Sequence, residues 1–327
     1  MNDADPRQPP QPGSEPEIHV PDDFGAGEVP GPAAPDDGGS YLWHPMEAPA
    51  SPVEPAIPPL PPRLIPNLGH SLVFFALLLP AFIGGWIITF GILRLVLHTV
   101  PTGTVMLRVG HEIHYAITAQ AVAYGIQWAL AALVFSLWWG RPLASGVHWN
   151  NAAAGRFFLR LALLGVVTGL VITLGGNFLP MPKAPPILKD LTTSTAGAWM
   201  LMIFGITLAP LTEELAFRGF LLPSLVNVFR WLERRGSMSE SSVRTVGIPI
   251  AIVLTSIPFA MVHAQQVSGS WGPLLLIGMV SVVLCIIRLA TDSVAAGFVV
   301  HACYNLTLFA GLLVQTDGFR HLGKLKG

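Results

Sequence analysis

The sequence predicts an all-α fold: a polytopic membrane helix bundle of about seven or eight transmembrane helices, preceded by a disordered N-terminal tail. Two observations support this prediction. Of the 327 residues, 52% are hydrophobic and only 11% are charged, whereas a soluble domain carries about 25% charged residues. Long apolar runs then follow one another after residue 70. Helices are expected for these runs because lipid cannot pair with exposed backbone groups.

The first 66 residues differ in composition from the rest of the chain. They contain 18 of the 30 prolines, and residues 1–60 hold 11 of the 19 acidic residues but only one basic residue, Arg7. Such a segment has too few large apolar side chains to form a core, so we expect a disordered, cytoplasmic tail. Residues 57–63 would suit an SH3-like or WW-like partner, although a plain solvated tether is the simpler interpretation. The sequence identifies no partner for the tail.

Seven apolar segments of the sequence are candidate transmembrane helices. We expect them at Ser71–Leu97, Tyr115–Trp139, Phe157–Leu179, Ala198–Leu222, Ile248–His263, Trp271–Ile287 and Ser293–Val314. Pro210 and Pro258 interrupt the fourth and fifth segments, and each proline removes one helical hydrogen bond. Gly165 and Gly169 are spaced for close packing of the third helix against a neighbour.

Basic residues outside the expected helices indicate the orientation. Residues 140–160 and 230–244 together hold seven arginines. With seven spans both stretches lie on the side of the N-terminus, which the positive-inside rule places in the cytoplasm. The basic C-terminal tail, residues 316–327, favours the opposite side, so the number of spans could differ by one. We expect an integral multi-pass protein of a bacterial plasma membrane, surrounded by the lipid bilayer, and the net charge of −1 indicates no nucleic-acid partner.

Two adjacent glutamates lie inside the fourth expected helix. Ionisable residues at membrane depth are costly, and they indicate a functional site by default. On a helix Glu214 and Arg218 are four residues apart and share a face, so the arginine can hold the carboxylate ionised. Glu213 points about 100° away from Glu214. The two acids can therefore have different roles, one structural and one reactive.

Two further polar clusters lie in later apolar segments. Phe259 and His263 are four residues apart, and so are His301 and Asn305. An imidazole N–H and an amide NH₂ can both donate hydrogen bonds to the oxyanion that forms when water attacks a carbonyl. Few other ionisable residues share the apolar segments, and Arg94 and Arg288 lie near helix ends, from which their side chains can reach the membrane surface.

Each polar residue also has a structural interpretation when it is considered alone. An isolated histidine or asparagine in a membrane helix can serve as a hydrogen bond between helices, and a glutamate–arginine pair can be purely structural. Three polar clusters on three separate apolar segments are harder to explain by packing. Together they favour a hydrolytic site.

The three clusters resemble the motifs of the CPBP (CAAX protease and bacteriocin-processing) intramembrane proteases. This family includes the type II CAAX prenyl endopeptidases. The matching residues are Glu213-Glu214-x-x-Phe217-Arg218, then Phe259-x-x-x-His263, then His301-x-x-x-Asn305. The resemblance covers roughly residues 195–315, the expected protease core, and leaves the helices of residues 67–194 without a motif.

The resemblance implies peptide-bond hydrolysis in a water-filled cavity among membrane helices. It implies that Glu213 and His263 activate water, and that His301 and Asn305 form the oxyanion hole. Supporting roles would fall to Glu214, Arg218 and Phe259. The substrate would be a membrane protein or peptide, and only some members of the family act on prenylated C-terminal tails.

Two questions remain open from the sequence. The resemblance favours a glutamate-dependent site that requires no cofactor, but zinc is possible, with Glu213, His263 and His301 as ligands. The first alternative to an endopeptidase is a non-catalytic membrane scaffold or immunity protein of the same fold. A proton-coupled transporter is the second alternative, and it is disfavoured because the first three helices show no matching set of polar residues.

Overall fold

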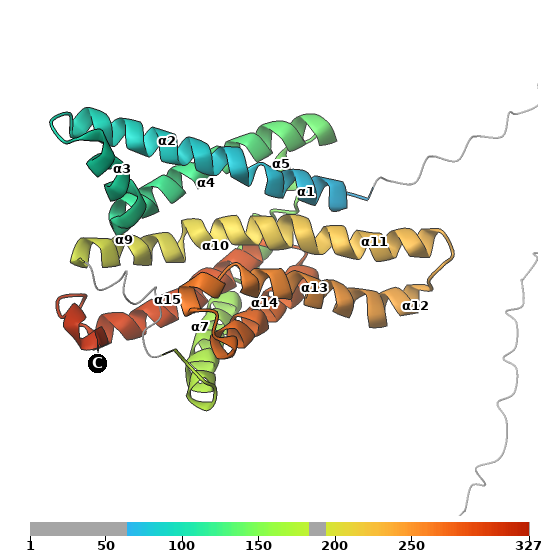
Figure 1. The fold of residues 1–327 in the computed structure, drawn as a ribbon. Coiled ribbons are helices and arrows are strands. Elements are labelled where there is room, and N and C mark those ends of the chain that lie inside the picture. Colours follow the sequence, from blue (N-terminus) through green and yellow to red (C-terminus); the bar gives the residue numbers. More distant parts are fainter. Residues whose placement is uncertain (1–63, 183–193, 327) are drawn as a thin grey trace, which may run out of the picture. The chain divides into compact units, whose positions relative to one another are not determined.

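The computed structural model describes residues 64–182 and 194–326. The predicted N-terminal tail, residues 1–66, therefore lies almost entirely outside the described residues. Within the described ranges every regular element is a helix (Figure 1), which confirms the predicted all-α fold.

The helices are α1 (Leu68–Ala76), α2 (Leu78–Val96), α3 (Thr102–His111), α4 (Ile113–Trp139), α5 (Leu143–Gly146), α6 (Asn151–Arg156), α7 (Phe158–Gly175), η1 (Gly176–Phe178), α9 (Thr195–Ile206), α10 (Leu208–Glu213), η2 (Glu214–Leu221), α11 (Leu222–Arg234), α12 (Glu240–Ser242), η3 (Val243–Gly247), α13 (Ile248–Met261), η4 (Ala264–Val267), α14 (Trp271–Thr291), α15 (Val294–Gln315) and η5 (Leu322–Lys326).

Seven helical stretches in the described part of the chain are long and apolar enough to cross a membrane, which agrees with the predicted number. They are Leu68–Val96, Ile113–Trp139, Phe158–Phe178, Thr195–Arg234, Glu240–Met261, Trp271–Thr291 and Val294–Gln315. Their outward faces carry large apolar side chains: Leu95 is 80% exposed and Leu159 is 79% exposed. Apolar side chains on an exposed face are expected where the surroundings are lipid.

The fourth and fifth spans differ most from their predicted limits. The fourth continues from Thr195 to Arg234 over 40 residues, instead of ending at Leu222. At 1.5 Å per residue this is roughly 60 Å, about twice the thickness of the hydrocarbon layer, so the helix extends beyond the membrane. Its additional part, α11, has a polar face that water can solvate. The fifth span begins at Glu240 and ends at Met261, whereas we expected Ile248–His263.

Close packing of helices depends on glycines at the contact points. A Cβ on Gly165 of α7 would lie 2.5 Å from the carbonyl oxygen of Val300 in α15, and one on Gly169 would lie 2.8 Å from the Cβ of Thr307. The predicted close approach at these two glycines is therefore confirmed, and α15 is the neighbour. This packing matters for the site because α15 carries two of the candidate residues.

An aromatic cluster holds η2 against α1 and α4. Phe74, Phe135, Phe217, Phe220 and Phe259 are all buried within it. The rings of Phe74 and Phe220 stack with their centroids 4.3 Å apart. Each buried phenylalanine contributes about 1.5–3 kcal/mol from the apolar surface that it removes from its unfolded environment in water. In a membrane, part of that gain is lost because lipid is also apolar. The tight packing of the rings then becomes the main source of rigidity.

The break between α9 and α10 places the first motif. Thr207 has φ −123° and ψ −83°, outside the helical region, and its hydroxyl donates to the carbonyl of Ile203 at 2.6 Å. Pro210 has no N–H, so the carbonyl of Ile206 loses its helical partner. The interruption predicted at Pro210 is therefore confirmed, and the glutamates follow it directly. By contrast, α13 continues through Pro258 and ends at Met261.

Candidate active site

A cavity of about 320 Å³ lies among α9, α10, α13, α14 and α15. Five of the predicted site residues line it: Glu213, Phe259, His263, His301 and Asn305. The other side chains around it are mostly apolar, including those of Leu201, Phe204, Ile277, Leu308, Phe309 and Leu312. The three motifs, which are far apart in the sequence, therefore meet at a single cavity.

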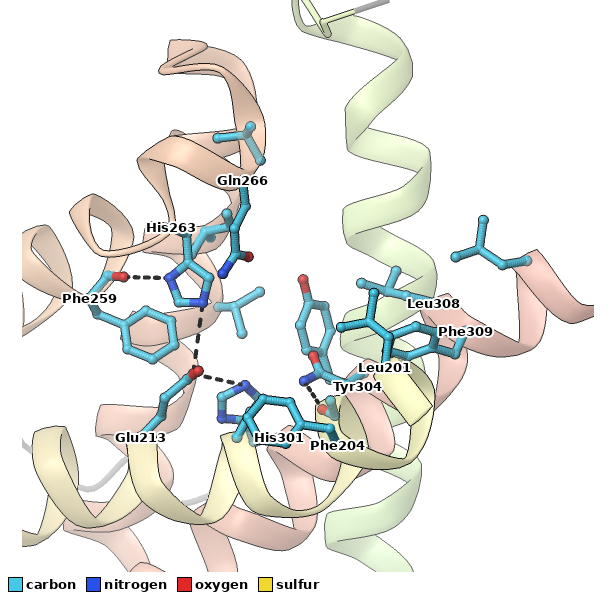
Figure 2. Close-up of a pocket in the computed structure, with 17 residues that line it drawn as sticks. Leu201, Phe204, Glu213, Phe259, His263, Gln266, His301, Tyr304, Leu308 and Phe309 are labelled. Carbon is cyan, nitrogen blue, oxygen red and sulfur yellow. Dashed lines mark hydrogen bonds and ion pairs between the residues drawn. The ribbon is translucent and has the colours of Figure 1, made fainter. Parts of the chain in front are cut away.

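Glu213 faces both histidines across this cavity, as Figure 2 shows. Its Oε2 lies 3.8 Å from Nε2 of His263 and 3.7 Å from Nε2 of His301. These separations exceed the length of a hydrogen bond, and polar groups at such distances are commonly bridged by water. The side chain of Glu213 is 20% exposed, so a small molecule in the cavity can reach it.

Hydrogen bonds on the far side of each ring fix the tautomers of the two histidines. Nδ1 of His263 lies 2.8 Å from the carbonyl oxygen of Phe259, which can only accept, so this nitrogen carries the proton. Nδ1 of His301 lies 3.0 Å from Oε1 of Glu214, the oxygen that already accepts from Arg218. Nδ1 of His301 must therefore carry a proton as well and donate it to this oxygen. In the neutral rings both Nε2 atoms are therefore acceptors that face the carboxylate of Glu213.

Glu214 is fully buried behind the cavity wall. Its Oε1 accepts a hydrogen bond from Nη1 of Arg218 at 3.0 Å, and both side chains are 0% exposed. The predicted contact between these residues is confirmed. Nη2 of Arg218 also donates to the carbonyl and hydroxyl oxygens of Ser281, at 3.1 Å and 2.8 Å. The buried charges are thus paired and hydrogen-bonded, as a low-dielectric interior requires.

The helix around the first motif is a π-helix, η2, instead of the expected α-helix. Such turns are wider, contain one extra residue per turn, and occur mostly at functional sites. The backbone carbonyl of Arg218 in this segment accepts a hydrogen bond from Nε of Arg288 at 3.1 Å. A side chain from α14 therefore supports the widened turn that carries Arg218.

Arg288 does not reach the membrane surface as we expected. It is 5% exposed, because its guanidinium points inward to the carbonyl of Arg218. The prediction was wrong because the polar partner of Arg288 lies on another helix, which a reading along one helix cannot reveal. The outer end of the guanidinium donates from Nη1 to Oδ1 of Asp292 at 2.7 Å.

Asp292 lies between α14 and α15, at the solvent end of this hydrogen-bonded chain. Its other oxygen, Oδ2, is 2.7 Å from Nδ1 of His148. Partial burial alone would raise the pKa of Asp292, but hydrogen bonds and charges from His148 and Arg288 outweigh it, and the pKa lies below its ordinary value. The chain of contacts thus runs from Asp292 through Arg288 to Arg218 and Glu214.

Gly297 allows Glu214 to approach α15. A Cβ at this position would lie 2.5 Å from Oε2 of Glu214, a distance that no side chain could occupy. The same oxygen is buried and has no hydrogen-bond partner among the described residues. The position of Gly297, one turn before His301, indicates that it lies near the site. The sequence does not show which helix packs against it.

Phe259 occupies the space between the buried pair and the cavity. The guanidinium carbon of Arg218 lies 4.4 Å from the centroid of the Phe259 ring, within the range of a cation–π contact. The same ring has its centroid 5.1 Å from that of His263 and 5.9 Å from that of His301. Phe259 therefore separates the buried cation from the cavity and packs against both histidines.

Asn305 lines the cavity, but one of its hydrogen bonds is directed elsewhere. Nδ2 donates to the carbonyl oxygen of Gly205 in α9 at 2.7 Å. An amide nitrogen carries two hydrogens, so a second donor remains for a ligand. The bond to Gly205 connects α15 to the end of α9 and fixes the orientation of the amide.

The alternative zinc ligands, Glu213, His263 and His301, are set slightly farther apart than the ligands of a tetrahedral zinc site. In tetrahedral zinc sites the bonds are about 2.0–2.1 Å long, which puts neighbouring ligand atoms roughly 3.4 Å apart. Here the distances from Glu213 to the histidines are 3.8 Å and 3.7 Å. No group of three or more His, Cys, Asp or Glu side chains in residues 64–182 and 194–326 has the arrangement of a metal site. We therefore derive no step through a metal.

No curated protein and no solved structure matched the chain. A protein-family comparison did give a match, and it falls on the segment that builds the cavity. Residues 195–307, which carry all three motifs, match the model of the family described as type II CAAX prenyl endopeptidase Rce1-like, so the family resemblance that the motifs indicated is confirmed for this segment.

Proposed function

We propose that the protein is an intramembrane endopeptidase that hydrolyses a peptide bond by means of water activated by Glu213. The observation that supports this most directly is the position of the Glu213 carboxylate, whose Oε2 lies 3.7 Å and 3.8 Å from two histidine nitrogens in a cavity. The match to a family of CAAX-type membrane endopeptidases supports the same reaction class.

In the proposed reaction a water molecule lies between Glu213 and His263. The water donates one hydrogen to Oε2 of Glu213 and the other to Nε2 of His263, which is an acceptor in the fixed tautomer. As the water oxygen attacks the scissile carbonyl, Glu213 takes the proton that the water releases. Glu213 then passes this proton to the leaving amine, and the products are a carboxylic acid and an amine.

The carbonyl oxygen becomes negatively charged in this step and needs hydrogen-bond donors. Asn305 supplies the N–H that Gly205 does not use. His301 can donate from Nε2 only as an imidazolium, because its Nδ1–H already goes to Glu214. Carboxylate oxygens lie on both sides of this ring, at 3.0 Å and 3.7 Å. Donors aimed at the developing charge are usually the largest contribution to such catalysis.

The substrate in this proposal is a membrane-associated protein or peptide. The apolar side chains of Phe204, Leu308 and Phe309 around the cavity suit an apolar residue next to the scissile bond. The same surfaces keep bulk water out and strengthen the electrostatic interactions inside.

The test compares wild type with Glu213→Gln in detergent or proteoliposomes. The substitution keeps the shape of the side chain and removes the base, so we expect cleavage of a membrane substrate to fall by about 10²–10⁴-fold. The unfolding temperature should remain near that of wild type. Glu233→Gln is the matched control, because it removes a carboxylate from the same helical run outside the cavity, and it should retain full turnover.

Metal removal distinguishes a glutamate-dependent site from a zinc-dependent site. We expect cleavage to persist with a zinc chelator and the purified protein to lack stoichiometric zinc. Stoichiometric zinc together with chelator-sensitive cleavage would instead assign Glu213, His263 and His301 as ligands. Full turnover by Glu213→Gln would contradict the proposal, and a wild type inactive on a broad panel of membrane substrates would favour a non-catalytic scaffold.

A further inference from the structure

A second cavity, separate from the candidate active site, lies where the ends of three helices meet. It has a volume of about 950 Å³ and is bordered by the start of α1, the end of α4 and the outer part of α11. Two buried hydrogen bonds hold its walls together: Ser71 to Ser224, with their Oγ atoms 2.7 Å apart, and Nδ2 of Asn227 to the carbonyl of Pro66 at 2.7 Å. The cavity is therefore framed by a connected part of the fold.

The charges around this cavity are all of one sign. Arg141 and Arg234 line it, and no aspartate or glutamate does so among the described residues. Nε of Arg141 is buried without a hydrogen-bond partner in the described part of the chain. An unpaired, partly buried guanidinium is costly, and it presents a fork of N–H donors that matches the oxygen atoms of a phosphate.

His70 adds a further donor. Its Nδ1 accepts a hydrogen bond from the backbone N–H of Asn67 at 3.0 Å, as part of the cap of α1. The proton of the neutral ring is therefore on Nε2. The ring packs edge-on against Trp138 and Trp139, with centroids 4.6 Å and 5.4 Å away, so its orientation is fixed by neighbours on α4.

Tryptophan side chains form much of the remaining wall. Trp138, Trp139 and Trp231 all line the cavity. Tryptophan is enriched where membrane helices cross the headgroup layer, because its ring is apolar and its N–H is polar. If the seven spans cross the membrane in alternating directions, the start of α1, the end of α4 and the end of α11 lie on the same side of the membrane. This is also the side of the arginine-rich stretches 140–160 and 230–244.

We propose that this cavity binds the phosphate of an anionic phospholipid headgroup. The guanidinium of Arg141 contacts the phosphate. Arg234 adds a positive charge, and Nε2–H of His70 adds a hydrogen-bond donor. The tryptophan rings cover the glycerol and the upper acyl chains. Basic pockets between membrane helices are known to bind lipid headgroups in this way. The site is independent of the proposed peptidase activity, and it would anchor α1 and α4 to the long helix that carries Glu213.

The test measures lipid binding by the full-length protein. Wild type, Arg141→Gln and Arg156→Gln are purified in detergent, titrated with phosphatidylglycerol or phosphatidylcholine, and analysed by native mass spectrometry and thermal unfolding. Arg156 is the matched control because it is an exposed arginine on the same membrane side that does not line the cavity. We expect wild type to bind phosphatidylglycerol preferentially and to be stabilised by it. Arg141→Gln should bind it about fivefold more weakly, and Arg156→Gln should match wild type.

Three results would overturn the proposal. Equal binding of both lipids by wild type would show that the cavity does not select a negative headgroup. Equal losses in Arg141→Gln and Arg156→Gln would show general surface attraction. Stabilisation of wild type by inorganic phosphate to the same extent as by phosphatidylglycerol would identify a site for free phosphate. If Arg141→Gln does not fold, Arg234→Gln takes its place with the same expected result, because that side chain is exposed.

Discussion

The two adjacent glutamates of the first motif lie in regions of opposite character. The open region consists of Glu213, His263 and His301, whose polar atoms face a cavity at distances too long for direct hydrogen bonds. The closed region consists of Glu214, Arg218, Ser281 and Arg288, which are buried and bonded to one another or to backbone. The open region has acceptors that face the cavity without a direct hydrogen-bond partner among the described residues. The closed region has charges that are paired with each other, although Oε2 of Glu214 has no hydrogen-bond partner among those residues.

This difference indicates how a membrane protein can keep a carboxylate that faces a cavity among apolar helices. The closed region fixes the backbone and the ring of His301, so that the open region can remain unsatisfied without collapsing. Substitutions in the closed region should therefore act first on stability. Substitutions in the open region should act on turnover while the fold persists, as we expect for Glu213→Gln.

The largest effect in the closed region is expected for Arg218→Ala. It leaves the fully buried Glu214 without its cation, and breaking a buried pair in this way costs about 3–5 kcal/mol. Thermal or denaturant unfolding of the purified protein measures this loss. Arg244→Ala is the matched control, because it removes the arginine of another i,i+4 pair whose side chains are 72% and 67% exposed. A similar small effect of both substitutions would mean that the closed region does not support the fold.

A smaller loss is expected for Arg288→Met, which keeps an unbranched side chain but removes the donor to the backbone of η2. The carbonyl of Arg218 would then be buried without its partner, at a cost of about 1.5–3 kcal/mol. Because Glu213 directly precedes the π-helix that carries Glu214, turnover should fall together with the unfolding temperature.

Asp292→Asn separates the two contacts of Arg288. It weakens the exposed ion pair and leaves the bond from Nε to the carbonyl of Arg218, so it should cost less than Arg288→Met. Equal losses in the two variants would show that the ion pair, and not the support of η2, is what Arg288 provides.

Gly297→Ala tests the contact between Glu214 and α15. The added methyl group would lie 2.5 Å from Oε2 of Glu214, and overpacking of this kind costs about 1–3 kcal/mol. Gly311→Ala on the same helix is the control, because nothing lies within 4 Å of a Cβ at that position. We expect Gly297→Ala to lower the unfolding temperature and Gly311→Ala to leave it unchanged or raise it slightly. The reverse order would show that α15 can move away from Glu214 at little cost.

The open region could be predicted from the sequence to a greater extent than the closed one. A spacing of four residues places His301 and Asn305 on one helical face. The resemblance to the family motifs then predicts that they share a site with Glu213. The partners of Arg218 could not be predicted in the same way. Ser281 and Gly297 are ordinary residues of apolar helices, and Arg288 was expected at the membrane surface. Their roles arise only from the packing of α14 and α15 against η2. The π-helix also has no signal in the sequence, and the donor that supports its widened turn, Nε of Arg288, lies on another helix.

The smallest effect is expected at the solvent end of the closed region, where Asp292 is 67% exposed. Its pKa is below the ordinary value, so the folded state holds the charged carboxylate more strongly than the unfolded chain does. The resulting stabilisation is present above the ordinary aspartate pKa of about 3.9 and is lost as the pH falls through the lowered value. Exposed ion pairs contribute only about 0–1 kcal/mol. Unfolding temperatures of wild type and Asp292→Asn, measured from neutral pH down to pH 3, should therefore differ slightly at neutral pH and begin to converge only as the pH falls below about 4. A difference that stays constant over this range would mean that the charge of Asp292 does not matter. In that case the closed region would end at the bond between Arg288 and the backbone of η2.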